Sequence, residues 1–174
     1  MIQLAFALVL SQSPAQVPLQ QPPPVDCADS AHRAFDFWVG DWHVTPTGSA
    51  TVIAHSQITV TANGCAIEED FRQTVGPGGA PTDYRGRSFT VYDPATAGWQ
   101  QFYIDSTGQL THFHGTVVDG AMVLDAPGLV AGVTRRMTIA ALTDGSVRQW
   151  GQRSTDGGIT WSEPTYDFTY RRNE

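Results

Sequence analysis

Polar and apolar residues alternate over most of the chain beyond residue 35, and this pattern predicts strands rather than helices. Asn63-Gly64, Asp119-Gly120 and Asp144-Gly145 are turn-forming dipeptides that separate strand-like segments. The segments read "FWVGDWHVTP", "SATVIAHSQITVTA", "CAIEEDFRQTV", "RGRSFTVYD", "GWQQFYID", "QLTHFHGTVV", "AMVLDA", "VTRRMTIAAL", "VRQWGQRS" and "TYDFTYRR". We predict an all-β antiparallel meander of about ten strands, closed into an up-and-down barrel because closure removes exposed edges.

The segment "FDFWVGDWHV", residues 35–44, carries apolar side chains on both faces of an alternating strand. Such a pattern indicates burial on both sides. We expect this segment to enter the barrel and seal one end with its rings, including Trp38 and Trp42. Function would then lie at the other end or in the lumen.

The N-terminus has the pattern of an export signal. The apolar run "IQLAFALVL" precedes Ser13-Pro14-Ala15, which has the small-x-small spacing of a cleavage site. We predict a signal peptide over 1–15, a Pro/Gln-rich linker over 16–26 and a barrel domain over 27–174; a disordered apolar tail is the alternative for the first segment. The run is too short for a membrane anchor, so no membrane span is expected after signal removal. The predicted location is periplasmic or extracellular.

The two cysteines agree with export. Cys27 follows the linker and Cys65 lies in a strand-like run. In an oxidising compartment they would form a disulfide that ties the entry segment to the second or third strand. Two free thiols are the alternative.

The net charge and the absence of several catalytic motifs argue against some classes of function. The chain of 174 residues has a formal net charge of −7 and no basic run, which argues against nucleic acid or an anionic membrane as a partner. No P-loop, dinucleotide fingerprint, nucleophile elbow or zinc-protease motif is present. We expect no cofactor, and the sequence specifies no oligomeric state.

Gly40-Asp41-Trp42 has the Gly-x-Trp spacing of the first strand of lipocalins and their calycin relatives. Together with "NGCAIEED", "YDPATAGWQQFYID", "DGAMVL", "VRQWGQRSTDGGITW" and "FTYRR", it makes residues 35–172 resemble an uncharacterised family of small, often exported, lipocalin-like bacterial domains. The resemblance implies a barrel in which Trp42 closes one end and Arg171 or Arg172 lies across its ring. It implies no activity.

Residues 154–161, "STDGGITW", fit the S-x-D-x-G-x-T-W pattern of an Asp-box. In such a turn the Asp156 carboxylate accepts backbone N–H bonds, glycine takes a positive φ, and Trp161 folds over the hairpin. A single copy in a chain of this length is no propeller. We interpret it as structural, with sugar binding as the alternative.

Two strand segments offer candidates for a site in the lumen. In "CAIEEDF", Glu69 shares the apolar face, where a carboxylate is costly unless paired. It would act as a general base or hold a cationic ligand, or else bond to a Tyr, Trp or Arg inside the barrel. In "GWQQFYID", Trp99, Gln101 and Tyr103 share a ring-rich face, which is typical both of a ligand cradle and of a packed barrel.

His112 and His114 flank Phe113 and therefore point to one face of a predicted strand. Two such imidazoles would bind a divalent metal if a neighbouring strand supplied a third ligand. No third ligand is evident from spacing, so we predict ordinary polar positions and no metal site.

Three hypotheses for function follow. The preferred one is an exported barrel that binds a small apolar or amphipathic molecule without converting it. The second is an isomerase, lyase or hydrolase that uses Glu69 or the His pair. The third is an accessory domain whose outer surface contacts another exported protein.

Overall fold

The computed structural model describes residues 26–173, so the predicted signal peptide over 1–15 and nearly all of the linker lie outside the described residues. The elements in chain order are α1 (Ser30–Arg33), η1 (Asp36–Trp38), β1 (Gly40–Pro46), β2 (Ala54–Thr61), η2 (Ala62–Gly64), β3 (Ala66–Val75), η3 (Pro77–Gly79), β4 (Pro81–Asp93), β5 (Gly98–Asp105), β6 (Leu110–Val118), β7 (Ala121–Pro127), β8 (Thr134–Ala141), β9 (Val147–Ser154) and β10 (Tyr166–Arg172). The longest α-helix among them has four residues, and no helix within residues 26–173 is long and apolar enough to cross a bilayer.

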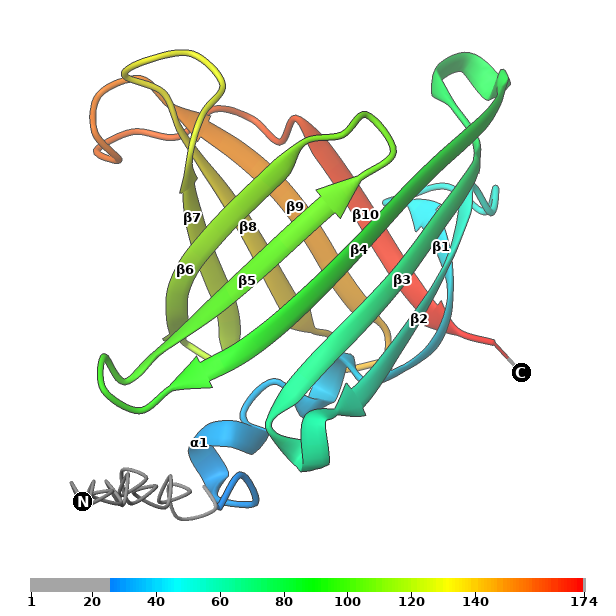
Figure 1. Ribbon diagram of the computed structural model, residues 1–174. Helices are drawn as coiled ribbons and strands as arrows, with labels where there is room; N and C mark the ends of the chain where they lie inside the picture. Colours follow the sequence, from blue (N-terminus) through cyan, green and yellow to red (C-terminus); the bar gives the residue numbers. More distant parts are fainter. Residues whose placement is uncertain (1–25, 174) are drawn as a thin grey trace, which may run out of the picture.

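The ten strands form one closed antiparallel barrel (Figure 1). Each strand pairs with the next in sequence, and β1 closes the barrel by pairing with β10. In the closing register His43 lies opposite Arg171 on one side and His55 on the other. This confirms the predicted up-and-down barrel of about ten strands.

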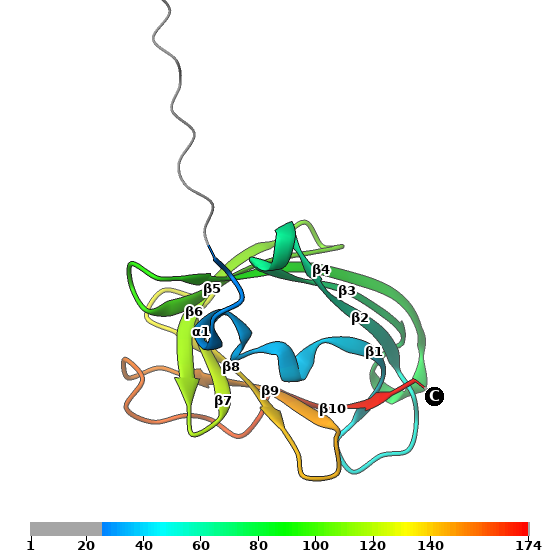
Figure 2. The same ribbon diagram turned by 90° about the horizontal axis from the view of Figure 1, so that it is seen from below.

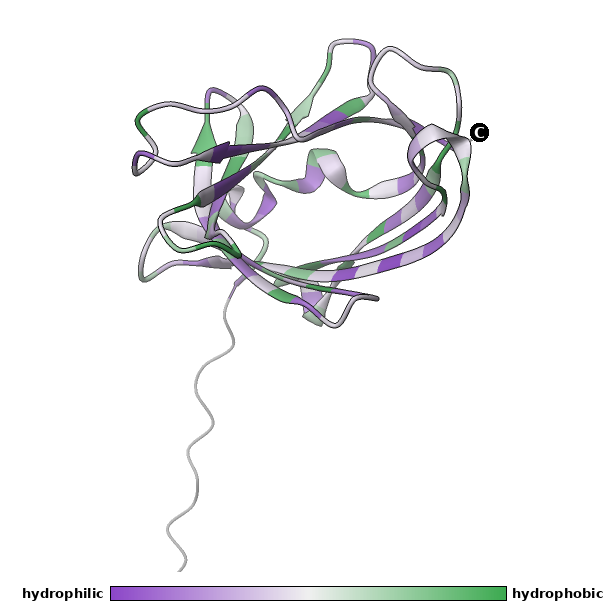
Figure 3. Ribbon diagram, turned by 90° about the horizontal axis from the view of Figure 1, so that it is seen from above, coloured by the Kyte–Doolittle hydropathy of each residue, from purple (hydrophilic) through white to green (hydrophobic). Residues whose placement is uncertain are grey.

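Alternation along the strands separates the lumen from the outer surface. In β5 the side chains of Trp99 and Gln101 are buried, whereas those of Phe102 and Ile104, at the alternate positions that follow, are exposed. Figure 3 looks along the barrel and shows hydrophilic and hydrophobic residues as alternating bands on the strands. The period of two assigns inward and outward residues directly from the sequence.

One end of the barrel is closed by the chain segment that leads into β1. Phe35, Trp38 and Trp42 are fully buried there, and Phe35 stacks on Trp38 with ring centroids 4.9 Å apart. Figure 2 shows the α1–η1 segment lying across this end. The expected seal is confirmed, but the expectation that the segment is a strand from Phe35 onward is wrong: residues 36–38 form a 3-10 turn and the strand begins only at Gly40. The turn lets successive rings enter the same core, which an extended strand would place on opposite faces.

Arg172 completes the closed end. Its guanidinium lies 4.3 Å from the centroid of the Trp42 ring, a cation–π contact, whereas Arg171 points to the outer surface and donates to Thr45 Oγ1 at 3.1 Å. A Cβ atom on Gly40 would overlap the Arg172 guanidinium. Gly40 is therefore required for close approach, which explains the Gly-x-Trp spacing physically.

The predicted disulfide is present. Cys27 and Cys65 are bonded, and the bond joins the segment before α1 to the start of β3. Arg33 of α1 also donates to the Gly64 carbonyl. The sealing segment is thus attached to the barrel wall on its N-terminal side as well as through β1.

The predicted Asp-box is the connection between β9 and β10. The Asp156 carboxylate accepts from the Ile159 and Thr160 amides at 3.1 and 3.0 Å and from the Ser154 hydroxyl at 2.7 Å. These bonds, above all those from Thr160, hold the pKa of Asp156 below its ordinary value. The Arg136 guanidinium covers the Trp161 ring at 3.8 Å, so one face of this Trp is already occupied.

Candidate functional site

A cavity of about 310 Å³ occupies the half of the lumen away from the closed end. This volume lies at the lower end of the range of about 300–1,000 Å³ seen for small-molecule sites. Its wall is formed by inward residues of β3, β4, β5, β6, β8, β9 and β10 together with one residue of the β5–β6 turn. The lining consists of Glu69, Phe71, Gln73, Tyr84, Gln101, Tyr103, Asp105, Gln109, Thr111, Phe113, Arg135, Met137, Gln149, Tyr166, Phe168 and Tyr170.

Glu69 is the buried carboxyl group of this cavity. It is 4% exposed and accepts a hydrogen bond of 2.8 Å from the Ser56 hydroxyl on β2. Burial raises the pKa of Glu69 to about 7, although the nearby hydroxyls of Ser56, Ser88 and Tyr170 favour the charged form. Near neutral pH this group therefore exists in both protonation states.

Tyr170 marks the boundary between the closed end and the cavity. Its ring lies edge to face with the rings of Trp38 and Trp42, with centroids 6.4 Å apart in each pair. Its hydroxyl donates to Gln149 Oε1 at 2.6 Å. Gln149 in turn donates to the Met137 sulfur at 3.0 Å. The wall of β8, β9 and β10 is thus connected by side-chain hydrogen bonds inside the lumen.

A second chain of hydrogen bonds holds the rings of β4 and β5. The hydroxyls of Tyr84 and Tyr103 share a bond of 2.8 Å, and Tyr84 donates to Asp105 Oδ2 at 3.3 Å. Burial raises the pKa of Tyr103, so this phenol stays neutral at physiological pH. A Cβ atom on Gly86 would overlap the Tyr103 ring, which shows that the glycine provides the space in which this ring lies.

The open end carries one charged group of each sign. Burial raises the pKa of Asp105, but hydrogen bonds from the Thr107 hydroxyl and amide outweigh burial and hold it below its ordinary value. Arg135 lies near the start of β8, where it donates to the Pro127 carbonyl at 3.2 Å and to Thr111 Oγ1 at 3.1 Å. Both charges are therefore engaged by the protein.

The structure brings three of the four residues predicted for ligand binding to one cavity: Glu69, Gln101 and Tyr103. Trp99 lies elsewhere. It is 4% exposed and packs against Phe35 at 5.8 Å, so it belongs to the core of the closed end and not to the cavity wall. Trp99 and Tyr103 share a face of β5, but they lie at different depths in the barrel.

The His pair lies on the outer surface. His112 stacks on Phe102 with ring centroids 4.3 Å apart, and its Nε2 lies 3.0 Å from Gln100 Oε1. The centroids of the His112 and His114 rings are 5.9 Å apart. Within residues 26–173, no three His, Cys, Asp or Glu side chains come close enough together to hold a metal ion. Neither histidine contributes to the cavity.

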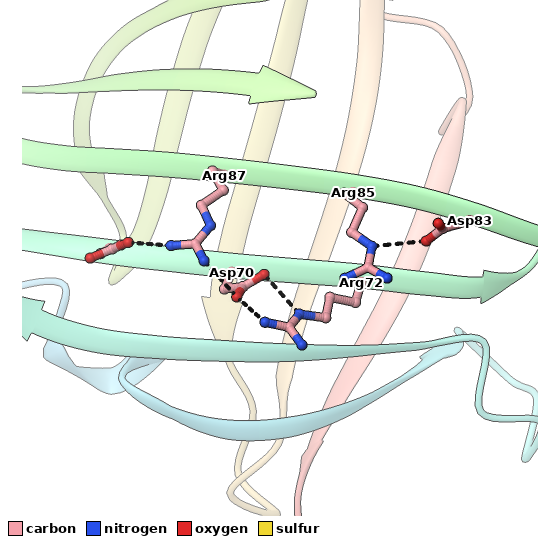
Figure 4. Close-up of polar contacts among 6 residues, drawn as sticks. Asp70, Arg72, Asp83, Arg85 and Arg87 are labelled. Atoms are coloured by element: carbon pink, nitrogen blue, oxygen red, sulfur yellow. Dashed lines mark hydrogen bonds and ion pairs between the residues drawn. The ribbon is translucent and has the colours of Figure 1, made fainter. Parts of the chain in front are cut away.

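The neighbours of Glu69 on β3 face outward. Glu68 and Asp70 pair with Arg87 at 2.7 and 2.9 Å, and Asp70 also binds Arg72 (Figure 4). Hydrogen bonding from Arg72 lowers the pKa of Asp70. Glu68 and Glu69 are therefore adjacent in sequence but opposite in environment: one is paired at the surface, and the other is buried beside a cavity.

Several lining residues were not predicted from the sequence. The rings of Phe71, Phe113, Tyr166, Phe168 and Tyr170 and the charge of Arg135 all lie in strands that were predicted correctly. Their inward orientation follows from alternation, but their convergence on one cavity depends on the pairing of β3 with β4 and of β9 with β10. The register of these pairs would have been needed to identify them.

No protein-family model matches this chain, and no curated protein matches it. The assignment of function therefore depends on the geometry of the cavity.

Proposed function

We propose that this protein is an exported, lipocalin-like barrel that binds one small amphipathic molecule in its lumen. The observation that supports this most strongly is the cavity itself, which is open at one end and lined by seven aromatic rings and a few polar groups. Apolar walls with a small number of oriented polar groups are typical of ligand sites. The Cys27–Cys65 disulfide is compatible with an oxidising compartment and hence with export.

The packing of the closed end leaves the opposite end of the barrel as the place where a ligand binds. Trp42 and Trp38 fill the closed end and the Trp42 indole donates to the Trp38 carbonyl at 2.9 Å. A ligand would therefore enter and leave through the end that carries Tyr84, Asp105 and Arg135. The hydrogen bonds among wall residues keep the rings apart before a ligand binds, which reduces the entropic cost of binding.

Native mass spectrometry of the full chain, exported by its own host, tests this proposal. Gln73→Trp places a large ring into the cavity from β3, whereas Thr74→Trp adds the same ring at an exposed neighbouring position. We expect a co-purifying mass on the wild type and on Thr74→Trp, and its loss from Gln73→Trp. A mass retained equally by both variants would place the ligand outside the lumen.

A second candidate function is catalysis in the same cavity. A carboxyl group with a pKa of about 7 exchanges protons efficiently near neutral pH, as a general acid or base must. Turnover of a co-purified compound that stops in Glu69→Gln, with binding retained, would establish an enzyme. Release of the compound unchanged by wild-type protein favours binding alone.

A further inference from the structure

We infer that the ligand of this cavity carries a positively charged amine, which pairs with the Glu69 carboxylate while its apolar body lies among the rings. This inference rests on the proposed function. It adds the chemical class of the ligand and the direction in which the ligand lies: charged group toward the closed end, apolar body toward the opening.

The buried carboxyl has hydroxyl neighbours but no cation. Glu69 receives a hydrogen bond from Ser56, and none of the ion pairs within residues 26–173 includes it. A buried charge is costly unless it is paired. A ligand ammonium group would supply the missing partner at the point where the chain supplies none.

Ser88 adds a free acceptor at the same depth. It lies directly opposite Glu69 in the pairing of β3 with β4 and is fully buried. Its hydroxyl favours the ionised form of Glu69, and its Oγ accepts no hydrogen bond from the described residues. An ammonium group donates several hydrogen bonds, so a carboxylate beside a spare hydroxyl oxygen suits it better than either group alone.

The aromatic wall favours a cation as well. The faces of Phe and Tyr rings are electronegative, and several such rings around one site are the usual recognition element for organic ammonium groups. Arg135 already uses this property, since its guanidinium lies 5.8 Å from the centroid of the Phe113 ring. The remaining rings of the wall, which include Tyr103, Tyr166 and Phe168, leave room for a second cation deeper in the lumen.

The open end does not reverse this preference. Asp105 and Arg135 carry opposite charges there, and both are engaged by neighbouring protein groups. The charge that a ligand meets at depth is therefore that of Glu69. An anionic group placed there would be repelled by Glu69 in a medium of low dielectric constant.

Isothermal titration calorimetry with three probes of one shape tests the inference: phenethylamine, phenethyl alcohol and phenylacetate. At about pH 8 Glu69 is ionised and an alkyl ammonium is still protonated. We expect phenethylamine to bind about tenfold or more tighter than phenethyl alcohol, because the ammonium group adds Coulomb attraction to the hydrogen bond that either probe donates to the carboxylate. Phenylacetate should bind most weakly.

Matched carboxamide variants locate the effect. Glu69→Gln should remove the preference for the amine over the alcohol, which is the ratio of the two affinities in one protein. Glu68→Gln removes a carboxylate from the adjacent outward position on β3 and should leave all three affinities unchanged. Retention of the wild-type preference in Glu69→Gln would overturn the inference.

Other outcomes separate the inference from the proposed function. If phenethyl alcohol binds as tightly as phenethylamine, and Gln73→Trp abolishes both, the lumen binds neutral ligands and the inference fails while the proposed function stands. If phenylacetate binds best, the site prefers anions and the inference fails likewise. If none of the three probes binds at millimolar concentration, the inference fails, and the co-purifying mass on the wild type and on Gln73→Trp decides the proposed function separately.

Amine affinity should also fall as pH is lowered through the Glu69 pKa of about 7, because protonation removes the carboxylate. Ser56 and Ser88, which face Glu69 from β2 and β4, do not titrate in this range. The other titratable or charged groups of the cavity are Tyr84, Tyr103, Tyr166, Tyr170, Asp105 and Arg135. The pKa of each of these tyrosines is raised and that of Asp105 is lowered, so Glu69 is the group that titrates near neutral pH.

Discussion

At the closed end of the barrel the rings of Phe35, Trp38 and Trp42 pack on one another and exclude solvent, whereas at the open end seven rings surround a cavity of about 310 Å³. The closed-end rings come largely from one continuous segment and pack directly against one another. The open-end rings come from separate strands. Several are held at the wall by hydrogen bonds of their hydroxyl groups, such as those of Tyr84 with Tyr103 and of Tyr170 with Gln149.

This difference shows how one barrel supports two roles. Contact between ring faces gives stability and leaves no room for a ligand, while hydrogen bonds from ring edges keep faces free for a ligand to touch. Substitutions at the closed end should therefore reduce the free energy of unfolding and leave ligand affinity unchanged. Substitutions in the lumen should change ligand affinity and lower the free energy of unfolding less than those at the closed end.

The largest effect is expected for Trp42→Ala. Removing this fully buried ring should lower the free energy of unfolding by about 3–5 kcal/mol, as measured by urea denaturation. Phe168→Ala at the cavity wall should cost only about 1–2 kcal/mol, because the ring is half-buried beside empty space. Equal costs at the two positions would remove the distinction between the ends.

Loss of the disulfide should have the next largest effect. The bond closes a loop with a sequence separation of 38 residues. The double substitution of Cys27 and Cys65 by serine should lower the free energy of unfolding by about 3 kcal/mol. Phenethylamine affinity, measured well below the new unfolding temperature, should match that of the wild type. A tenfold loss would show that the geometry of the cavity depends on the segment that closes the other end.

Glu69→Gln should change how stability depends on pH. The folded-state pKa of about 7 exceeds the ordinary value of 4.5, so the folded protein binds the proton more tightly than the unfolded chain does. Without ligand, the wild type should lose up to about 3 kcal/mol of stability as pH rises from below 4.5 to above 7. The glutamine variant should lack this loss and be more stable than the wild type at about pH 8.

Urea denaturation of both proteins at several pH values measures this difference. Glu68→Gln, at the outward and only partly buried neighbouring position, should follow the wild-type curve in this pH range. A wild-type curve that is flat between these pH values would contradict the assigned state of Glu69.

Arg172→Ala should have the smallest of these effects. Loss of the cation–π contact with Trp42 should cost about 1 kcal/mol, and Arg171→Ala should cost less because Arg171 faces outward. Gly40→Ala should displace the guanidinium, so its cost and that of Arg172→Ala should be less than additive in a double-mutant cycle. Full additivity would show that the glycine serves another purpose.

The sequence predicts the closed end better than the open end for a physical reason. Gly40 and Trp42 lie on one strand, β1, and meet the arginines of one of its two neighbours, β10, so a short motif is enough to identify them. Of the two arginines, only the register of β1 with β10 selects Arg172. The 3-10 turn at residues 36–38 was missed because the packing of Trp38 and Phe35, and not local periodicity, determines it.

The cavity was predicted only in part. Alternation alone placed Glu69, Gln101 and Tyr103 on inward faces, and each of them lines the cavity. Alternation does not give depth, which is why Trp99 was grouped with them although it lies in the closed-end core. The contribution of β10 to the wall depends on the barrel closing, which no local pattern encodes.

The account is tested most directly by mapping a bound probe with nuclear magnetic resonance. The side-chain amides of Gln101 and Gln149 report on the cavity, the indole N–H of Trp42 reports on the closed end, and the ring of His112 reports on the outer surface. On titration with phenethylamine, the account predicts that the two glutamine signals shift together in wild-type protein, and that they do not shift in Gln73→Trp. Shifts confined to Trp42 or His112, with the glutamine signals unchanged, would contradict it.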